Sequence, residues 1–446
     1  MLKVHLICFI SNALIFDFFD FRWTSDDHKE EKLYFLDINS SYAHVCSTFE
    51  FPAGKCEVLI DEFLKEKNIT FDGNVLRTSK KPLFGLIKAY ILPNPNFPPF
   101  FSLKFESKTF YVLCKECLKK KSKKICNHSE MQRAFTVSTT TSAMNFALKH
   151  NYVKILYYLE IFDFEYQGKI FQKFTNILLN LQQNELKDDK MAIKFIKNGL
   201  QGAFGKFSSN CNKQKQVLCR NFHDLNSILL KSSSKVTNIE LISDDLCDVT
   251  YDDRHFHNNH RKNNISLIIG NFIVWGGRIL LESKIMKIND TFHNVKLKMM
   301  NTDSVIFSMP AYYNLSEKIT ISNEIGQWKN QIQNSCEITH FYSLNPVCYN
   351  VSYISNDGSR CQVNKICGFN FQCVSSKIEA KDFEVLLSKA IEDEYFGIEV
   401  EQFRTYKKMD LKKKVVFTLR NTLDQKRIIL PSFQTLPYGY KTLPCE

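Results

Sequence analysis

The chain has 446 residues, of which 44% are hydrophobic and 24% are charged. These proportions are typical of a folded globular protein and exclude a disordered or fibrous one. Its 59 lysines and arginines outnumber 47 aspartates and glutamates, which gives a net charge of +12. Such a surplus favours a polyanionic partner, most simply nucleic acid, although an acidic membrane surface has the same sign of charge.

The 15 cysteines are spread along a long chain. This spacing is unlike that of a small disulfide-rich protein, and we predict reduced cysteines and an intracellular location. The most apolar stretch, residues 4–16, is followed by Asp17 and is shorter than the roughly 20 residues that span a bilayer. Because acidic residues follow it where a signal peptide would have a small-residue cleavage site, we interpret it as a buried strand or helix. No membrane partner is expected.

The first clear element is KLYFLDI, residues 32–38, whose short apolar run predicts a buried strand with Asp37 near its end. A mixed stretch with several prolines follows, and then a basic, cysteine-bearing hairpin or loop at residues 114–128. These segments have the character of an insertion into a core fold.

Residues 185–204 have the periodicity of an amphipathic helix. One face carries Ala192, Phe195, Ile196, Gly199 and Ala203, and the other carries Lys187, Lys190, Lys194, Lys197 and Gln201. Lysines on one helical face could hold a triphosphate, whereas most such faces are simply solvated.

Further elements follow in the second half of the chain. Residues 265–285 predict an apolar helix, and residues 296–307 predict a strand, a turn carrying Asp303 and a second strand. Another helix is expected at residues 378–391. Two aspartates presented on turns could bind two divalent ions for phosphoryl transfer, but each alone also fits an ordinary turn.

Three segments in order decide between these alternatives: DINSSYA at residues 37–43, KNGLQGAFGKF at residues 197–207 and MNTDSVIF at residues 300–307. Together they resemble the motifs of family B DNA polymerases, in particular the protein-primed branch of linear plasmids, viruses and Maverick-type elements. The matching residues are Asp37, Ser40, Tyr42, Lys197, Gly205, Thr302, Asp303 and Ser304.

The resemblance implies an α+β right-hand polymerase fold with an antiparallel-sheet palm, helical fingers and a C-terminal thumb. The expected regions are an N-terminal remnant (1–31), palm (32–60), an insertion with a Cys/His cluster (61–165), fingers (166–207), a second insertion (208–262), palm (263–375) and thumb (376–446). Only 36 residues precede Asp37, too few for the editing exonuclease domain usual in the family, so no proofreading is expected.

The resemblance also implies a function, template-directed addition of deoxynucleotides to a primer 3′-hydroxyl. Its expected partners are primer-template DNA, deoxynucleoside triphosphates and, in this branch, a terminal protein primer. Asp37 and Asp303 would bind two magnesium ions. The residues expected at the nucleotide are Ser40, Ser41, Tyr42, Lys190, Lys194, Lys197 and Gln201. Those expected at DNA are Gly205, Lys206, Arg278, Tyr349 and Lys365.

Several positions depart from the family pattern. Asn301 stands where the family has the first aspartate of D-T-D, Gln201 and Gly202 replace N-S, Phe204 replaces tyrosine, and Val347 replaces a lysine. The loss of a carboxylate near a metal weakens catalysis. The alternative to an active polymerase is therefore a catalytically decayed, element-derived protein that still binds DNA.

Cys114, Cys117, Cys126 and His128 form a C-x2-C-x8-C-x-H pattern. Its first pair has the spacing of zinc ligands, while the final C-x-H is tighter than usual. The pattern predicts either a zinc site or free surface cysteines beside a basic loop.

Overall fold

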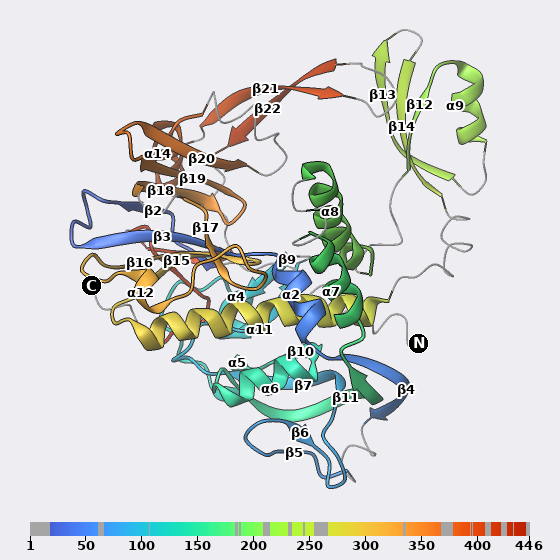
Figure 1. Cartoon of the computed structure of the whole chain (residues 1–446), viewed down its shortest axis with the longest axis vertical. Helices are drawn as coiled ribbons and strands as arrows, with labels where there is room; N and C mark the ends of the chain where they lie inside the picture. Colours follow the sequence, from blue (N-terminus) through green and yellow to red (C-terminus); the bar gives the residue numbers. More distant parts are fainter. Residues whose placement is uncertain are drawn as a thin grey trace.

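The computed structural model describes residues 18–60, 67–106, 108–182, 186, 189–207, 215–230, 234–243, 246–253, 266–332, 336–366, 378–392, 394, 396–405, 412–420, 426–430 and 432–442. The described residues include four sheets of three to five strands and one long helix, α11 (Leu267–Thr291), which runs across the molecule (Figure 1). The apolar stretch at residues 4–16 lies outside the described residues.

The central sheet has the strand order β1-β15-β16-β3-β17, and every pairing in it is antiparallel. Its strands are β1 (Phe18–Phe19), β15 (Lys296–Asn301), β16 (Ser304–Pro310), β3 (Glu31–Ile38) and β17 (Trp328–Asn330). The predicted strand at 32–38 and the predicted hairpin at 296–307 are both confirmed. One face of the sheet packs on α11, where Leu36 and Val305 meet Leu281 and Ile285.

A flanking sheet lies beside the central one, with the order β2-β18-β19-β20. Its strands are β2 (Arg22–Thr24), β18 (Glu337–Asn345), β19 (Cys348–Ile354) and β20 (Arg360–Ile366). Helix α14 (Ala380–Ile391) covers it by burying Phe383 and Leu386 against Phe341. This confirms the helix predicted at 378–391.

The inserted sheet has the order β10-β7-β11-β4 and lies on the other side of α11. Its strands are β10 (Phe135–Thr140), β7 (Gly85–Pro93), β11 (Val153–Gly168) and β4 (Phe51–Ile60). Strand β4 falls at the end of the region assigned from sequence to the palm. It pairs with β11 from Ile60↔Glu160 to Phe51↔Gly168. Cross-strand side-chain contacts select the partner of a strand, whatever its place in the chain.

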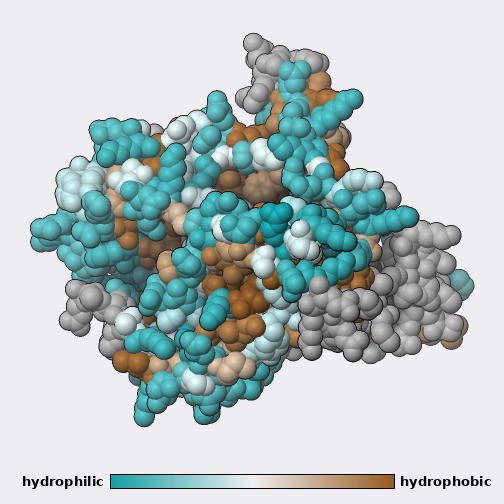
Figure 2. Space-filling model, turned by 90° about the horizontal axis from the view of Figure 1, so that it is seen from below, coloured by the Kyte–Doolittle hydropathy of each residue, from teal (hydrophilic) through white to brown (hydrophobic). Residues whose placement is uncertain are grey.

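Short elements complete the inserted region: β5 (Thr70–Phe71), β6 (Leu76–Arg77), β8 (Ser102–Phe105), β9 (Lys108–Tyr111), α4 (Lys115–Lys119), α5 (Glu130–Arg133) and α6 (Thr141–Lys149). The segment 114–128, expected as a basic hairpin or loop, thus contains one short helix, α4, and α5 follows it. Seen from this side, hydrophobic residues reach the surface near the centre of a mainly hydrophilic face (Figure 2).

A small peripheral sheet is formed inside the expected second insertion, with the order β12-β14-β13. It consists of β12 (Lys215–Cys219), β14 (Leu246–Asp253) and β13 (Ser234–Ser243), and it carries α9 (Phe222–Leu229). Cys219, Ile228 and Val249 form its separate core. It projects from the rest of the molecule opposite the β21–β22 hairpin, which comprises β21 (Gly397–Thr405) and β22 (Lys412–Arg420) (Figure 1).

Three helices lie to the right of the central sheet in Figure 1: α2 (Ser41–Thr48), α7 (Gln172–Asn180) and α8 (Lys190–Phe207). Helix α8 begins after Asp189, whose Oδ1 accepts hydrogen bonds from the backbone N–H groups of Met191 and Ala192 at 2.9 and 3.0 Å. Its buried face consists of Ile196 and Leu200, which pack on Ala43 of α2. Phe195, assigned from sequence to the apolar face, is instead 79% exposed.

The remaining described elements are α12 (Leu315–Lys318), β23 (Ile428–Ile429) and β24 (Thr435–Leu436). Helix α11 extends the predicted helix at 265–285 by six residues at its C-terminal end. Of the helices that the structure describes, none is long and apolar enough to cross a membrane.

Helix α11 carries a buried ion pair at its contact with the inserted region. Arg278 is only 3% exposed and lies 3.0 Å from the Glu282 carboxylate, and its guanidinium packs over the rings of Phe100 and Tyr111. The DNA contact predicted for Arg278 does not fit this position, because the side chain is enclosed by protein. Its role is to join α11 to the inserted region.

We expect Arg278→Leu to lower the free energy of unfolding by about 3–5 kcal/mol, because it leaves the Glu282 carboxylate buried without its cation. Urea denaturation measures this loss. In the matched double variant Arg278→Leu/Glu282→Leu the loss should be much smaller. Equal losses in the single and double variants would contradict this explanation.

Candidate active site

The pairing of β3 with β16 brings the two predicted catalytic aspartates together. Asp37 stands opposite Ser304, and the backbone N–H of Ile38 donates to the carbonyl oxygen of Asp303 at 2.8 Å. The carboxyl groups of Asp37 and Asp303 lie within hydrogen-bonding reach of each other. Residues 266 positions apart in the sequence thus form one acidic pair.

A residue with left-handed backbone directly precedes Asp303, and another follows Asp37 by three positions. Ser40, before α2, has a φ of 51°, and Thr302, in the β15–β16 turn, has a φ of 54°. This conformation is uncommon for a β-branched residue such as threonine. The backbone N–H of Asp303 donates to the carbonyl oxygen of Asn301 at 2.7 Å, which tightens the turn. The side chain of Asp303 lies toward Asp37 on β3. Such strain is concentrated at functional sites.

A cavity of about 180 Å³ opens over the acidic pair. It is lined by Phe35, Asp37, Asn301, Thr302, Asp303, Ser304, Gln331, Tyr349 and Lys365. These residues come from the central sheet, the flanking sheet and the segment that follows β17. The site is therefore assembled where the two sheets meet.

The electrostatics of the site are those of two acids forced together. Burial and the neighbouring Asp303 raise the pKa of Asp37 to about 7, and burial raises the pKa of Asp303. Lys329 and Lys365 oppose the shift at Asp37. The sequence pattern did not indicate Lys329 as a site residue, because its strand, β17, has only three residues and a polar flank. It stands opposite Asp37 in the sheet register.

The residues present fit magnesium. Two partly buried carboxylates at hydrogen-bonding distance repel each other when both are ionised, and a divalent cation between them removes that cost. Carboxylate oxygens are also the ligands that magnesium prefers.

Tyr42 is held beside the acidic pair by a close approach of two helices. A Cβ atom added at Gly277 of α11 would lie 2.9 Å from the Tyr42 ring, so only glycine leaves room for the ring there. Burial and the Asp303 charge raise the pKa of Tyr42 to about 12, which keeps its hydroxyl protonated. Ser41 is 2% exposed beneath it, so the predicted contact of Ser41 with a nucleotide does not fit its position.

The other predicted residues divide into three groups. Tyr349 and Lys365 line the cavity, with the Lys365 ammonium 5.8 Å from the centre of the Tyr349 ring. Gly205 is exposed on α8, and Ser40 is half-buried next to the pair. The side chains of Lys190, Lys194, Lys197, Gln201 and Lys206 lie outside the described part of the structure, although the backbone of α8 is described.

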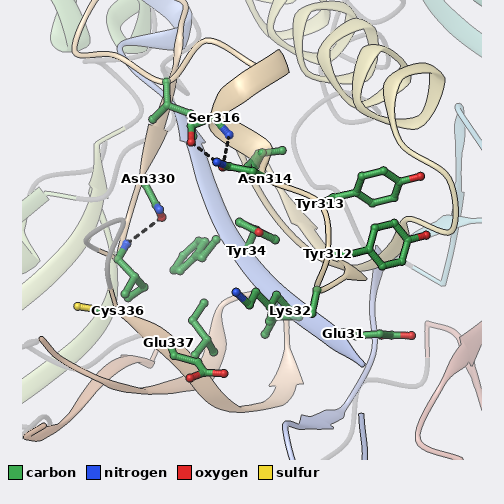
Figure 3. A pocket seen from close by; sticks show the side chains of 17 residues that line it. Glu31, Lys32, Tyr34, Tyr312, Tyr313, Asn314, Ser316, Asn330, Cys336 and Glu337 are labelled. Atoms are coloured by element: carbon green, nitrogen blue, oxygen red, sulfur yellow. Dashed lines mark hydrogen bonds between the residues drawn. The ribbon is translucent and has the colours of Figure 1, made fainter. Parts of the chain in front are cut away.

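A larger cavity of about 510 Å³ lies at the other end of β3 and contains neither aspartate. Figure 3 shows Tyr312 and Tyr313 along one side, with Lys32 and Tyr34 of β3 near its middle. Ser316 Oγ donates to Asn314 Oδ1 at 2.8 Å on its wall. The acidic pair, and not this larger cavity, has the chemistry of an active site.

The predicted Cys/His cluster is also brought together. The ligand atoms of Cys114, Cys117, Cys126 and His128 lie within 4.8 Å of one another. All three cysteines are buried, which is inconsistent with the alternative of free surface cysteines.

Comparison with known proteins agrees with this geometry. Residues 23–267, more than half of the chain, match the family described as DNA polymerase type B, organellar and viral. The chain belongs to this family. No curated protein matches the chain.

Solved structures of phi29 DNA polymerase share the fold of this type B polymerase chain. The complex with primer-template DNA has a TM-score of 0.54 and 14% identity, and the ternary complex with incoming nucleotide has a TM-score of 0.54 and 13% identity. Each match covers 94% of this chain and 62% of the phi29 chain. The complex with single-stranded DNA has a TM-score of 0.53 and 13% identity, covering 86% and 58%. The chain thus has the α+β fold of a polymerase and spans less than two thirds of the length of these relatives.

Asn301, where the family pattern has aspartate, makes a contact that aspartate cannot make. Its Nδ2 donates to the carbonyl oxygen of Pro346 at 2.8 Å, and its Oδ1 accepts from the Thr302 hydroxyl at 3.1 Å. The amide therefore links the turn of Asp303 to the β18–β19 turn. An ionised carboxylate in its place would face the Pro346 carbonyl oxygen without a proton to donate.

We expect Asn301→Asp to lower the free energy of unfolding of the magnesium-free protein by about 1–3 kcal/mol, because it leaves a part-buried acceptor unsatisfied and sets a negative charge facing it. Chemical denaturation in the presence of a chelator measures the change. Asn301→Ala, which removes the donor but adds no charge, is the control and should cost less. An unchanged or raised stability in Asn301→Asp would contradict the role given to this hydrogen bond.

A second expectation concerns pH. Because the pKa of Asp37 is raised from 3.8 to about 7, the folded protein retains a proton that the unfolded chain releases between these values. The stability of the magnesium-free protein should therefore fall as pH rises through this window, and then stay level. Asp37→Asn should remove this component, whereas the exposed Asp290→Asn should keep it. Denaturation at several pH values tests this, and parallel curves for wild type and Asp37→Asn would exclude it.

Proposed function

We propose that the chain is a DNA-directed DNA polymerase that adds deoxynucleotides to a primer 3′-hydroxyl under the direction of a template. In this proposal the central sheet with Asp37 and Asp303 is the palm, α7 and α8 belong to the fingers, and the C-terminal region with α14 is the thumb. The observation that carries the proposal is the acidic pair, formed by antiparallel pairing of two motif strands at the edge of an open cavity.

The acidic pair gives the site its chemistry. Asp37 and Asp303 would hold two magnesium ions, which supply charge neutralisation at the phosphates and activation of the primer hydroxyl. The strained turn at Thr302 fixes the direction of Asp303, and the β3 register fixes that of Asp37. Lys329 and Lys365 add positive charge at the rim, which favours the approach of phosphate groups.

Helix α8 would supply the contacts to the incoming nucleotide. It packs through Ile196 and Leu200 on α2, the helix that carries Tyr42. The spacing of Lys190, Lys194, Lys197 and Gln201 places them on one side of the helix, where the lysines would hold the triphosphate. The Tyr42 ring, fixed against Gly277, would lie under the sugar and exclude a 2′-hydroxyl.

Primer-template DNA and deoxynucleoside triphosphates are the proposed partners. The net charge of +12 supports the first, because neutralisation of phosphates dominates affinity for DNA. Lys365 and Tyr349, at the cavity, are the proposed contacts to the primer end, together with Gly205 and Lys206 on α8. A terminal protein primer is proposed from the family branch that the motifs resemble.

Asn301 favours a second candidate, a DNA-binding protein without catalytic activity. At the position where the family pattern has a third carboxylate, the Asn301 amide instead donates a hydrogen bond to Pro346. In this candidate the position has a structural role. The proposed polymerase and this alternative bind DNA through the same basic surface. Only a measurement of catalytic turnover distinguishes the two candidates.

We expect purified protein to extend a labelled primer-template with magnesium and all four deoxynucleotides, and Asp303→Asn to lose at least about a thousandfold in rate. The estimate follows from the loss of one charge near a cation, worth about 4 kcal/mol at 4 Å and an effective dielectric constant near 20. Affinity for primer-template, measured by fluorescence anisotropy, should change little.

Asp290→Asn, an exposed substitution on α11, is the matched control and should retain full activity. If wild type binds DNA but neither it nor any variant extends the primer, the binding-only protein is the correct assignment. Loss of both binding and extension in Asp303→Asn would instead assign Asp303 a structural role.

A further inference from the structure

The Cys/His cluster has the geometry of a closed four-ligand site. His128 Nδ1 lies 3.4 Å from Cys114 Sγ, 3.3 Å from Cys117 Sγ and 3.7 Å from Cys126 Sγ. A tetrahedral zinc ion with Zn–S bonds of about 2.3 Å and a Zn–N bond of about 2.0–2.1 Å separates sulfur and nitrogen ligands by about 3.6 Å. The three distances lie close to this value.

The surroundings of the cluster also suit a metal. Cys114, Cys117 and Cys126 are at most 5% exposed, and none of them forms a disulfide. The N–H of Cys117 donates to Cys114 Sγ at 3.4 Å. Three buried sulfur atoms converging on one imidazole nitrogen indicate a soft divalent ion, and four protein ligands indicate a structural rather than a catalytic site.

The chain on both sides of these ligands is bonded to the C-terminal segment, defined here as residues 433–440. The N–H of Leu113 donates to Tyr438 O at 2.9 Å, and the N–H of Cys126 donates to Tyr440 O at 2.9 Å. The Tyr440 hydroxyl donates to Lys123 O, also at 2.9 Å. The loop that carries the ligands therefore binds the segment through three hydrogen bonds.

Gly439 brings the C-terminal segment into direct contact with a ligand residue. It has a φ of +92°, and a Cβ atom added there would lie 2.3 Å from Cys114 Cβ. Only glycine combines this backbone conformation with this approach. Tyr438 and Tyr440, on either side, are buried in the same core as Cys114 and Cys117.

The other end of the segment is bonded to the central sheet. The N–H of Thr435 donates to Asp20 Oδ1 at 3.1 Å, and the N–H of Phe21 donates to Phe433 O at 3.0 Å. Asp20 in turn pairs with Lys298 of β15. The C-terminal segment thus connects the strand that leads to Asp303 with the loop that carries the Cys/His cluster.

We propose that Cys114, Cys117, Cys126 and His128 bind one zinc ion, and that this ion holds the C-terminal segment between the inserted region and the central sheet. The zinc ion fixes the conformation of a loop that has little regular structure of its own. That conformation presents Leu113, Lys123 and Cys126 to the C-terminal segment. Without the ion, the three thiols and the histidine are no longer joined through a metal, and the loop loses that constraint.

The first experiment measures metal content. Protein purified without added metal should contain one zinc per chain by plasma mass spectrometry, and replacement by cobalt should give the absorption of a tetrahedral thiolate site. Cys114→Ser/Cys117→Ser should lose both signals, and the matched control Cys56→Ser, at an exposed cysteine on β4, should keep them. Absence of zinc and of the cobalt spectrum in the wild-type protein would overturn the proposal.

The second experiment measures hydrogen exchange in the wild-type chain, so it does not depend on how well a variant folds. Removing zinc with a selective chelator, in excess magnesium, should speed exchange of amides in residues 433–442 by about tenfold or more, and zinc should reverse this. Peptides from the peripheral sheet, which has its own core, should not change. Tyr440→Phe should keep the zinc and still speed exchange of this segment.

Two results would contradict the link between the ion and the segment. If zinc is bound but its removal leaves exchange at residues 433–442 unchanged, the ion does not hold the segment. If its removal speeds exchange throughout the chain, including the peripheral sheet, the ion supports global folding instead. Neither readout depends on polymerase activity, so failure here is distinct from failure of the proposed function.

Discussion

The antiparallel pairing of β3 with β16 is the constraint on which the site depends. It sets Asp37 opposite Ser304, and so beside Asp303 at the end of the neighbouring turn. A slip of one residue would turn every side chain of β3 to the opposite face and move Leu36 and Ile38 out of the core formed with α11. The hydrophobic core therefore enforces the register that holds two carboxylates together against their mutual repulsion.

Helix α11 extends this constraint to the rest of the molecule. Its C-terminal half supports the central sheet through Leu281 and Ile285, and its middle meets α2 at Gly276 and Gly277. The close approach of the two helices fixes Tyr42 near the acidic pair. On another side, Arg278 packs over Phe100 and Tyr111, and Glu282 accepts a hydrogen bond from the Tyr152 hydroxyl, so that both residues join α11 to the inserted region. One helix thus relates the acidic pair, α2 and the inserted region.

The inserted region and the C-terminal segment form a second connection to the central sheet. Asp20, Lys298 and Thr435 link the N-terminal and C-terminal parts of the described chain to β15, at a distance in sequence of more than 400 residues. The loop that carries the Cys/His cluster binds the other end of the C-terminal segment. A site formed by residues far apart in the sequence needs such links, because local structure alone cannot fix their relative positions.

The sequence by itself determined the motif strands, the amphipathic helix and the acidic residues, because apolar periodicity and short motifs are local properties of a chain. Strand 32–38, hairpin 296–307 and helix 378–391 were predicted for this reason. The sequence also indicated the four Cys/His ligands through their spacing, and the family through three motifs in order.

Only the tertiary structure decided which neighbours each residue has. Arg278 is enclosed by Phe100 and Tyr111, residues that no local pattern relates to it, and β4 pairs with a strand about a hundred residues away. Lys329 reaches the acidic pair through a three-residue strand too short to leave a pattern. The hydrogen bond from Asn301 to Pro346 depends on the contact of two sheets. Such contacts arise from long-range packing, in which burial and sheet pairing select partners without regard to their distance along the chain.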